Sequence, residues 1–314
     1  MAAPPPDTTA APAVTSHYGP PPWSPTRYRM LLETMRPKQW AKNAFVLAGL
    51  VFSGRALELD AELRAWGTFV AFCAVSSASY LVNDLRDRER DRLNPRTAGR
   101  PIARGDIGPR TALIAAAGCG AVALALAALM NLATLGVVAG YLVLQLAYSN
   151  WLKHVLFVDV MCIASGFLLR TLAGLTCIEA ELSPWILLAT GLLALFLGLA
   201  KRRGEVVAIG GGRDVRQRPV LANYSVALLD ELIAVVTPCI VIVYALYGVL
   251  AAPTDAMLIT LPFVLYGIFR VLYLIHHHSA VTEDPSVLAV RDRPLMACIV
   301  LWGITAAVVT VVAY

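Results

Sequence analysis

Charged residues are scarce in this chain. Asp, Glu, Lys and Arg make up 15% of its 314 residues, whereas hydrophobic residues make up 58%. An ordinary soluble domain carries about 25% charged residues, and the mean hydropathy of this chain is clearly positive. This composition excludes a soluble globular domain, and we expect no nucleic-acid partner.

Two further signals are missing. The first 26 residues are rich in Pro, Ala and Thr and lack the apolar core of a secretory signal peptide. We therefore predict a disordered tail over residues 1–26 and one membrane domain over residues 27–314. The six cysteines show no CxxC spacing, so they are expected to be small packing residues and not metal ligands.

Apolar stretches long enough to cross a bilayer recur along the chain. A helical span needs about 20 mostly apolar residues, and several such stretches carry no charge at all. The first span has the shortest apolar part, from Ala44 to Gly54. We predict an all-α polytopic membrane bundle of nine transmembrane helices, near residues 43–57, 65–83, 111–130, 132–151, 156–178, 182–200, 231–252, 256–275 and 294–314.

Lys and Arg residues collect on one side of these spans. Of the 26 in the chain, 22 lie in the loops of one side, and only Arg55 and Arg64 lie on the other. Because Lys and Arg accumulate in cytoplasmic loops, the amino terminus is predicted to be cytoplasmic and the carboxyl terminus external. We expect a multi-pass protein of the inner (plasma) membrane whose active site faces the cytoplasm.

An acidic stripe follows the second predicted span. On a helix continued from that span, Asn83, Asp87 and Asp91 repeat at i, i+4 and i+8 and share one face, with Asp84 beside them. Oxygen ligands suit Mg²⁺, which completes its coordination shell with water and substrate phosphate oxygens. These four residues are therefore predicted to bind a Mg²⁺-diphosphate. The alternative is a surface helix whose Asp and Arg side chains pair with one another.

The same segment carries a family resemblance. It reads Asn83-Asp84-x-x-Asp87-x-x-x-Asp91, followed by Asn94-Pro95 and Arg100-Pro101-Ile102-Ala103-x-Gly105. This order resembles the first aspartate-rich motif and loop of the UbiA superfamily of membrane prenyltransferases, and the resemblance extends over roughly residues 30–314. It implies a UbiA-like bundle of nine helices with the amino terminus inside and Mg²⁺ as the cofactor.

A second aspartate-rich motif, which most members of that superfamily carry after the sixth helix, is missing. Its place is taken by Lys201-Arg202-Arg203-Gly204-Glu205. With this run and the segments Arg36-Pro37-Lys38-Gln39-Trp40-x-Lys42-Asn43, Tyr148-Ser149-x-x-Leu152-Lys153-His154, Asp159-Val160 and Gly166-Phe167-x-x-Arg170, the chain resembles the decaprenyl-phosphate phosphoribosyltransferase branch. The resemblance implies transfer of phosphoribose from 5-phosphoribosyl 1-pyrophosphate to decaprenyl (polyprenyl) phosphate, for arabinan precursors of the cell wall.

Cations are expected to hold the phosphates of both substrates. Lys38 and Lys42 lie at i and i+4, on one face of an α-helix; the alternative for both is interfacial snorkelling. Arg170 lies deep in its span and needs a partner or a water-filled cavity. Asp159, about three turns earlier, is expected to line the same cavity, and either Asp159 or Glu205 is expected to orient ribose hydroxyls. The expected substrate-binding residues are Lys38, Lys42, Tyr80, Arg100, Tyr148, Lys153, Arg170, Lys201, Arg202, Arg203 and Glu205, and the expected catalytic residues are Asp84, Asp87, Asp91 and Asp159.

Two other functions stay open. One is an aromatic-acceptor polyprenyltransferase of the same superfamily, against which the missing second aspartate cluster argues. The other is an anion transporter, against which we find no internal repeat and a charged stripe at the membrane face and not at the midplane. Lipid chain length and oligomeric state stay open too, a homo-oligomer included.

Overall fold

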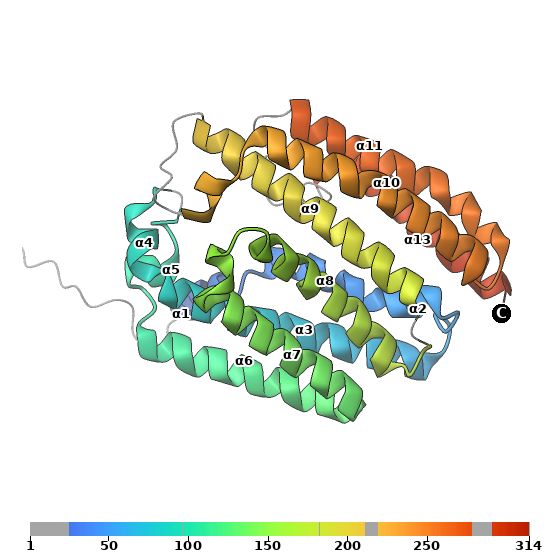
Figure 1. Cartoon of the computed structure of the whole chain (residues 1–314). Helices are drawn as coiled ribbons and strands as arrows, with labels where there is room; N and C mark the ends of the chain where they lie inside the picture. The colour runs from blue at the N-terminus through green and yellow to red at the C-terminus, as the bar shows by residue number, and fades with distance from the viewer. Residues whose placement is uncertain (1–24, 96, 182, 211–218, 278–290, 314) are drawn as a thin grey trace, which may run out of the picture.

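The computed structural model describes residues 25–95, 97–181, 183–210, 219–277 and 291–313 (Figure 1). Within these residues the secondary structure is helical and contains no strand, as the all-α prediction requires. The predicted tail lies outside the described residues, except for Pro25 and Thr26, which begin helix α1 (Pro25–Thr34).

Eight long helices confirm eight of the predicted spans. Each is long and apolar enough to cross a bilayer, and their ends lie within about ten residues of the predicted ends. They are α3 (Leu59–Arg86), α6 (Pro109–Met130), α7 (Leu132–Asn150), α8 (Val158–Cys177), α9 (Pro184–Gly210), α10 (Val226–Leu250), η5 (Asp255–Thr260) continued by α11 (Leu261–His277), and α13 (Arg293–Ala313).

The nine-span count is not confirmed, because the first predicted span is not one α-helix. In its place, 3₁₀-helix η1 (Pro37–Leu47) is followed by the short α-helix α2 (Ala48–Phe52). A 3₁₀-helix rises about 2.0 Å per residue and an α-helix about 1.5 Å, so η1 and α2 together extend about 30 Å. That length matches the thickness of a hydrocarbon core, about 30 Å, although the segment contains fewer residues than an ordinary α-helical span.

Two glycines let this segment lie directly against α8. A Cβ atom on Gly49 would collide with the carbonyl oxygen of Gly174, and one on Gly174 would collide with the carbonyl oxygen of Val46. Both collisions involve backbone atoms, which cannot rotate away as a flexible side chain can. The close backbone contact therefore requires glycine at both positions.

Replacing Gly174 by Ala should destabilise the fold by about 1–3 kcal/mol, as overpacking of a tight interface does. The free energy of unfolding in mixed detergent micelles measures the loss. Gly140→Ala on α7 is the matched control, because an added Cβ there meets nothing within 4 Å. Equal stability of the two variants would contradict the close contact between η1 and α8.

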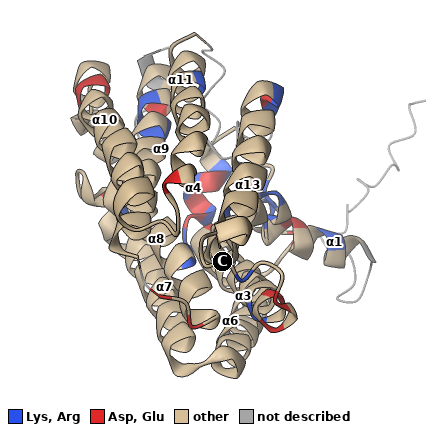
Figure 2. Ribbon diagram, turned by 90° about the vertical axis from the view of Figure 1, so that its right-hand side faces the viewer, with Lys and Arg blue, Asp and Glu red and all other residues tan. Residues whose placement is uncertain are grey.

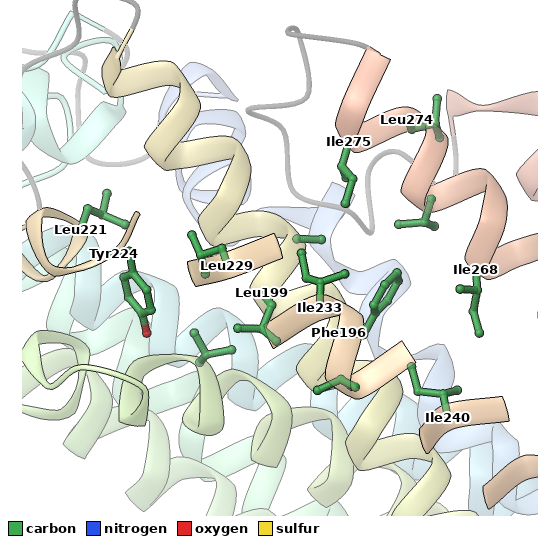
Figure 3. Packing of buried hydrophobic residues seen from close by; sticks show 14 of the residues in the cluster. Phe196, Leu199, Leu221, Tyr224, Leu229, Ile233, Ile240, Ile268, Leu274 and Ile275 are labelled. Atoms are coloured by element: carbon green, nitrogen blue, oxygen red, sulfur yellow. The ribbon is translucent and has the colours of Figure 1, made fainter. Parts of the chain in front are cut away.

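The helices pack in a continuous series of neighbouring pairs, with α8 also contacting η1, α2 and α3. Neighbouring pairs run from α3 and α6 through α7, α8 and α9 to α10, and α13 packs against both α11 and α2. Figure 1 shows α8 between the α3–α6–α7 group and the α9–α10–α11–α13 group. The core of the second group is a cluster of aliphatic and aromatic side chains that includes Phe196, Leu199, Ile233, Ile240 and Ile268 (Figure 3).

Most of the charge lies at the ends of this bundle, and Arg170 in α8 and Arg270 in α11 lie within long helices. Most of the length of the long helices is free of Lys, Arg, Asp and Glu, and charged segments gather on the connecting helix α4 (Arg88–Leu93) and near helix ends (Figure 2). Besides α4, the connecting segments are α5 (Pro101–Arg104), η2 (Leu152–His154) and η4 (Pro219–Asn223). Helices α3, α7 and α9 end, and α8 begins, at the end of the bundle where α4 and η2 lie, which we call the charged end.

Candidate functional site

A cavity of about 280 Å³ opens between α3, α7, α8, α9 and η1 at the charged end. Nine of the predicted site residues line it: Lys42, Tyr80, Asn83, Asp87, Asp91, Tyr148, Lys153, Arg170 and Lys201. The other seven do not: Lys38, Asp84, Arg100, Asp159, Arg202, Arg203 and Glu205. The rest of the wall comes from Arg36, Ser79, Arg90, Asn94, Tyr141, Gln145, Ser149, His154, Ile163, Gly166, Phe167, Leu197 and Gly198.

The acidic stripe reaches the cavity although its helix is interrupted. Helix α3 ends at Arg86, Asp87 caps it, and α4 begins at Arg88, so the single continuous helix that the sequence suggested is wrong. The i+4 spacing survives because the amide of Asp87 still donates to the carbonyl of Asn83, at 2.9 Å, and the amide of Asp91 to that of Asp87, at 2.8 Å. Asn83, Asp87 and Asp91 therefore line the cavity together.

Asp84 faces away from the cavity and is buried. It accepts hydrogen bonds from Arg36, at 2.5 Å, and from Arg100, at 3.2 Å. Arg100 also donates to Asp91, at 2.7 Å, while the guanidinium of Arg36 lies 4.9 Å from the centre of the Tyr80 ring. In this structure Asp84 therefore orients two arginines, of which Arg36 lines the cavity.

Positive charge dominates the cavity wall. Six lining residues are Lys or Arg and only two, Asp87 and Asp91, are carboxylates. Lys153, which is 7% exposed, donates to both oxygens of Asp87, at 2.9 and 3.1 Å. The remaining excess of cations favours a ligand that carries several negative charges.

The two lysines of η1 do not share a face. In an α-helix residues i and i+4 point about 40° apart, but in a 3₁₀-helix of three residues per turn they point about 120° apart. Lys42 lines the cavity and Lys38 does not. The spacing argument for Lys38 was therefore wrong, because it assumed an α-helix.

The basic run on α9 also divides. Successive residues of an α-helix point about 100° apart, so Lys201 faces the cavity while Arg202 and Arg203 face elsewhere. Arg202 is fully buried and pairs with Asp159, at 2.6 Å, and with Glu205, at 2.5 Å. Arg203 instead pairs with Asp230 on α10, at 2.5 Å. The structure shows Arg202 and Arg203 in ion pairs within the protein.

The buried ion pair connects to the cavity through a tyrosine. Arg202 donates to the hydroxyl oxygen of Tyr148, at 3.2 Å, and Tyr148 lines the cavity. On the other side, Asp159 is completely buried and accepts a hydrogen bond from the hydroxyl of Tyr224, at 2.8 Å. Asp159 is thus held between Arg202 and Tyr224, away from the cavity where it was expected.

Tyr224 also accepts a hydrogen bond from the amide of Phe157, at 2.9 Å. Burial, together with the hydrogen bond to Asp159, raises the pKa of Tyr224 to about 12. The phenol is thus protonated in the fold to higher pH than in the unfolded chain, whose tyrosines titrate near 10. Its contribution to stability is fully present below about pH 10 and is lost as the pH rises through about 12.

Tyr224→Phe should therefore lower the free energy of unfolding by about 1–2 kcal/mol. The difference from the wild type should stay constant up to about pH 10 and shrink as the pH approaches 12. Unfolding in mixed micelles as a function of pH measures both effects. A difference that is unchanged at pH 12 would contradict the role of the protonated hydroxyl.

Several polar residues of the wall were not among the predicted site residues, Arg36, Tyr141 and Gln145 among them. Tyr141 and Gln145 lie on α7 at i and i+4, with Tyr148 one turn further, so they form a polar stripe in an otherwise apolar span. That spacing is a signal that could have found them. Arg36 was visible only as part of a family motif, since its left-handed backbone (φ 56°) and its contact with Asp84 depend on the fold.

The possible metal ligands at the end of the cavity beside α4, which we call its mouth, fit Mg²⁺. Asn83, Asp87, Asp91 and Asn94 all line the cavity and offer only amide and carboxylate oxygens and amide nitrogens. In the described part of the chain, no three His, Cys, Asp or Glu side chains converge to hold a metal by themselves. Proteins commonly bind Mg²⁺ through one or two carboxylates together with substrate phosphates and water.

Comparison with known proteins identifies the family. The model of the UbiA prenyltransferase family matches residues 43–291. The chain belongs to the UbiA prenyltransferase family. This UbiA protein is 32% identical over 287 residues to the decaprenyl-phosphate phosphoribosyltransferase of Mycolicibacterium smegmatis, covering 87% of this chain and 89% of that one. It is 34% identical over 231 residues to the protein of the same name from Corynebacterium glutamicum, covering 69% and 67%.

The fold of this UbiA protein also matches solved structures. A UbiA homologue from Archaeoglobus fulgidus, bound to GPP and Mg²⁺, superposes with a TM-score of 0.71 at 18% identity, covering 90% of this chain and 99% of that one. That similarity shows the fold alone. Together with the eight apolar helices, family membership makes the chain an integral membrane enzyme.

Proposed function

We propose that this UbiA enzyme transfers phosphoribose from 5-phosphoribosyl 1-pyrophosphate to decaprenyl (polyprenyl) phosphate, releasing pyrophosphate, on the cytoplasmic side of the inner membrane. The observation that carries the proposal is the composition of the cavity wall, with six Lys or Arg residues and two carboxylates. Two substrates that both carry phosphate require such an excess of cations. The names of relatives that cover most of this chain support the same pair of substrates.

The mouth of the cavity suits the pyrophosphate of the donor. Asn83 and Asp87, with Asp91, are the residues that would hold Mg²⁺, and the ion would neutralise the charge that develops on the leaving pyrophosphate. Lys153 contacts Asp87 and is placed to bind a pyrophosphate oxygen beside it. Arg36, which Asp84 orients from behind, supplies a second cation at the same place.

The bond changes need no strong general base. The bond between the ribose anomeric carbon and the pyrophosphate oxygen breaks, positive charge develops on the ribose ring, and an oxygen of the lipid phosphate forms the new bond. That phosphate is already ionised, so no proton has to be removed from the nucleophile. Tyr148, whose oxygen accepts from Arg202, keeps its own proton to donate toward a substrate oxygen in the cavity.

The test is transfer of label from ribose-labelled 5-phosphoribosyl 1-pyrophosphate to decaprenyl phosphate by the purified full-length protein in detergent. The expected result is Mg²⁺-dependent appearance of label in the lipid phase. Consumption of a polyprenyl diphosphate with an aromatic acid, and no transfer of phosphoribose, would instead make the protein an aromatic-acceptor prenyltransferase. An anion flux in proteoliposomes without any transfer would overturn both readings.

A further inference from the structure

Arg170 is a buried charge whose partners are all neutral. It is 4% exposed, yet it lines the cavity. Its guanidinium donates to the side-chain oxygen of Asn43, at 2.8 Å, to the carbonyl of Gly166, at 2.7 Å, and to the hydroxyl of Tyr141, at 2.8 Å. Across the described ranges, no carboxylate forms an ion pair with it.

Such a charge is expensive to bury alone. A guanidinium stays protonated at every physiological pH, and an uncompensated buried charge destabilises a protein by several kcal/mol. The rings of Phe72, Tyr141 and Phe167 lie 4.7–5.7 Å from the guanidinium carbon and offset part of this cost. The remaining positive charge points to an anion from outside the protein.

Hydrogen-bond donors for that anion are available at the same place. A guanidinium has five N–H groups, and the three bonds of Arg170 leave two of them, one on each terminal nitrogen. Gln145 also lines the cavity, and its side-chain amide has no hydrogen-bond partner among the described residues. An added Cβ on Gly166 would lie 3.5 Å from both Arg170 Nη1 and Gln145 Nε2, so these two side chains flank the open space that Gly166 leaves.

This group lies away from the oxygen ligands at the mouth. Along α3, Phe72, whose ring faces the Arg170 guanidinium, is eleven residues before Asn83, and that separation corresponds to about 16 Å. We call the end of the cavity at Tyr141, Gln145 and Arg170 its floor. Beside the floor the wall is apolar, formed by Ile163 and Phe167 on α8 and by Leu197 on α9.

We propose that the floor of the cavity is a binding site for a phosphomonoester, held by Arg170, Gln145 and the hydroxyl of Tyr141 and separate from the diphosphate site at the mouth. The inference rests on the proposed function, because that reaction brings two phosphomonoesters into the cavity. One is the phosphate of the acceptor lipid, and the other is the 5-phosphate of the donor. The apolar wall beside the floor suits the lipid.

The test measures binding of three probes to the full-length protein in detergent: farnesyl phosphate, ribose 5-phosphate, and inorganic pyrophosphate with Mg²⁺. Gln145→Met keeps the side-chain volume but removes the amide, and Arg170→Gln removes the charge. Both variants should weaken one phosphomonoester by about tenfold or more and leave pyrophosphate unchanged. Lys153→Met, at the mouth, should do the opposite, and unfolding midpoints establish that each variant is folded.

The outcomes distinguish the lipid phosphate from the donor's 5-phosphate, and they distinguish failure of this inference from failure of the proposed function. Weaker farnesyl phosphate binding makes the floor the acceptor site, and weaker ribose 5-phosphate binding makes it the site of the donor's 5-phosphate. If neither probe is weakened in Gln145→Met, if only pyrophosphate is, or if the wild type binds neither phosphomonoester, the inference is overturned. A floor that binds a phosphomonoester in a protein without phosphoribosyl transfer would instead refute the proposed function alone.

Discussion

Replacing Asp87 by Ala should lower kcat/KM for phosphoribosyl transfer by at least about a hundredfold, because several kcal/mol of charge stabilisation is lost from the leaving pyrophosphate. Asp87 lines the mouth between Asn83 and Asp91 and contacts Lys153 through both oxygens. Removing it takes away a proposed metal ligand and leaves Lys153 without its carboxylate partner. Turnover at several Mg²⁺ concentrations measures the effect.

Two controls make this result specific. Asp87→Asn keeps the volume and removes only the charge, so it should lose most of the activity while the unfolding midpoint stays near that of the wild type. Asp106→Ala removes an aspartate outside the cavity, where it pairs with Arg104 on an exposed surface, and it should transfer phosphoribose normally. Full turnover by Asp87→Ala would remove Asp87 from the metal site.

The long helices could be predicted because their signal is local. A run of about 20 apolar residues forms a span whatever its neighbours are, and such runs locate the eight long helices. The segment from Pro37 to Phe52 could not be predicted in this way. Its 3₁₀ geometry accompanies a backbone contact between Gly49 and Gly174, which lie 125 positions apart in the chain.

The same distinction applies to the site. Asn83, Asp87 and Asp91 were found because helical spacing alone places them on one face. Whether a Lys or Arg side chain can contact a substrate or is held in an ion pair within the protein depends on partners that lie far away in the sequence. Arg202 meets Asp159 43 residues away, and Arg36 meets Asp84 48 residues away.

The basic segment that replaces the second aspartate-rich motif shows how these distant partners limit a prediction from sequence. Its replacement by three basic residues suggested three phosphate ligands, but consecutive residues on a helix point in different directions. Only Lys201 of the three lines the cavity. The chain therefore balances Arg202 with Asp159 and Glu205, and the cations that line the cavity come from several different elements.

Arg202→Met should destabilise the protein by about 3–5 kcal/mol, as does removal of one partner from a buried ion pair. Asp159 is completely buried, and without Arg202 its charge is left with the hydroxyl of Tyr224. The double variant Arg202→Met, Asp159→Asn should recover part of the loss, because the remaining buried group is then neutral. Reversible unfolding in mixed micelles, analysed as a double-mutant cycle, gives the coupling energy.

The neighbouring residue provides the matched control. Arg203→Met breaks an ion pair with Asp230, whose side chain is 37% exposed, and pairs that solvent screens contribute about 1 kcal/mol or less. It should therefore destabilise the protein much less than Arg202→Met. If Arg202→Met instead unfolds like the wild type but shows a raised KM for a phosphate substrate, the main role of Arg202 is in substrate binding and not in stability. That role would act through Tyr148, which lines the cavity and accepts a hydrogen bond from Arg202.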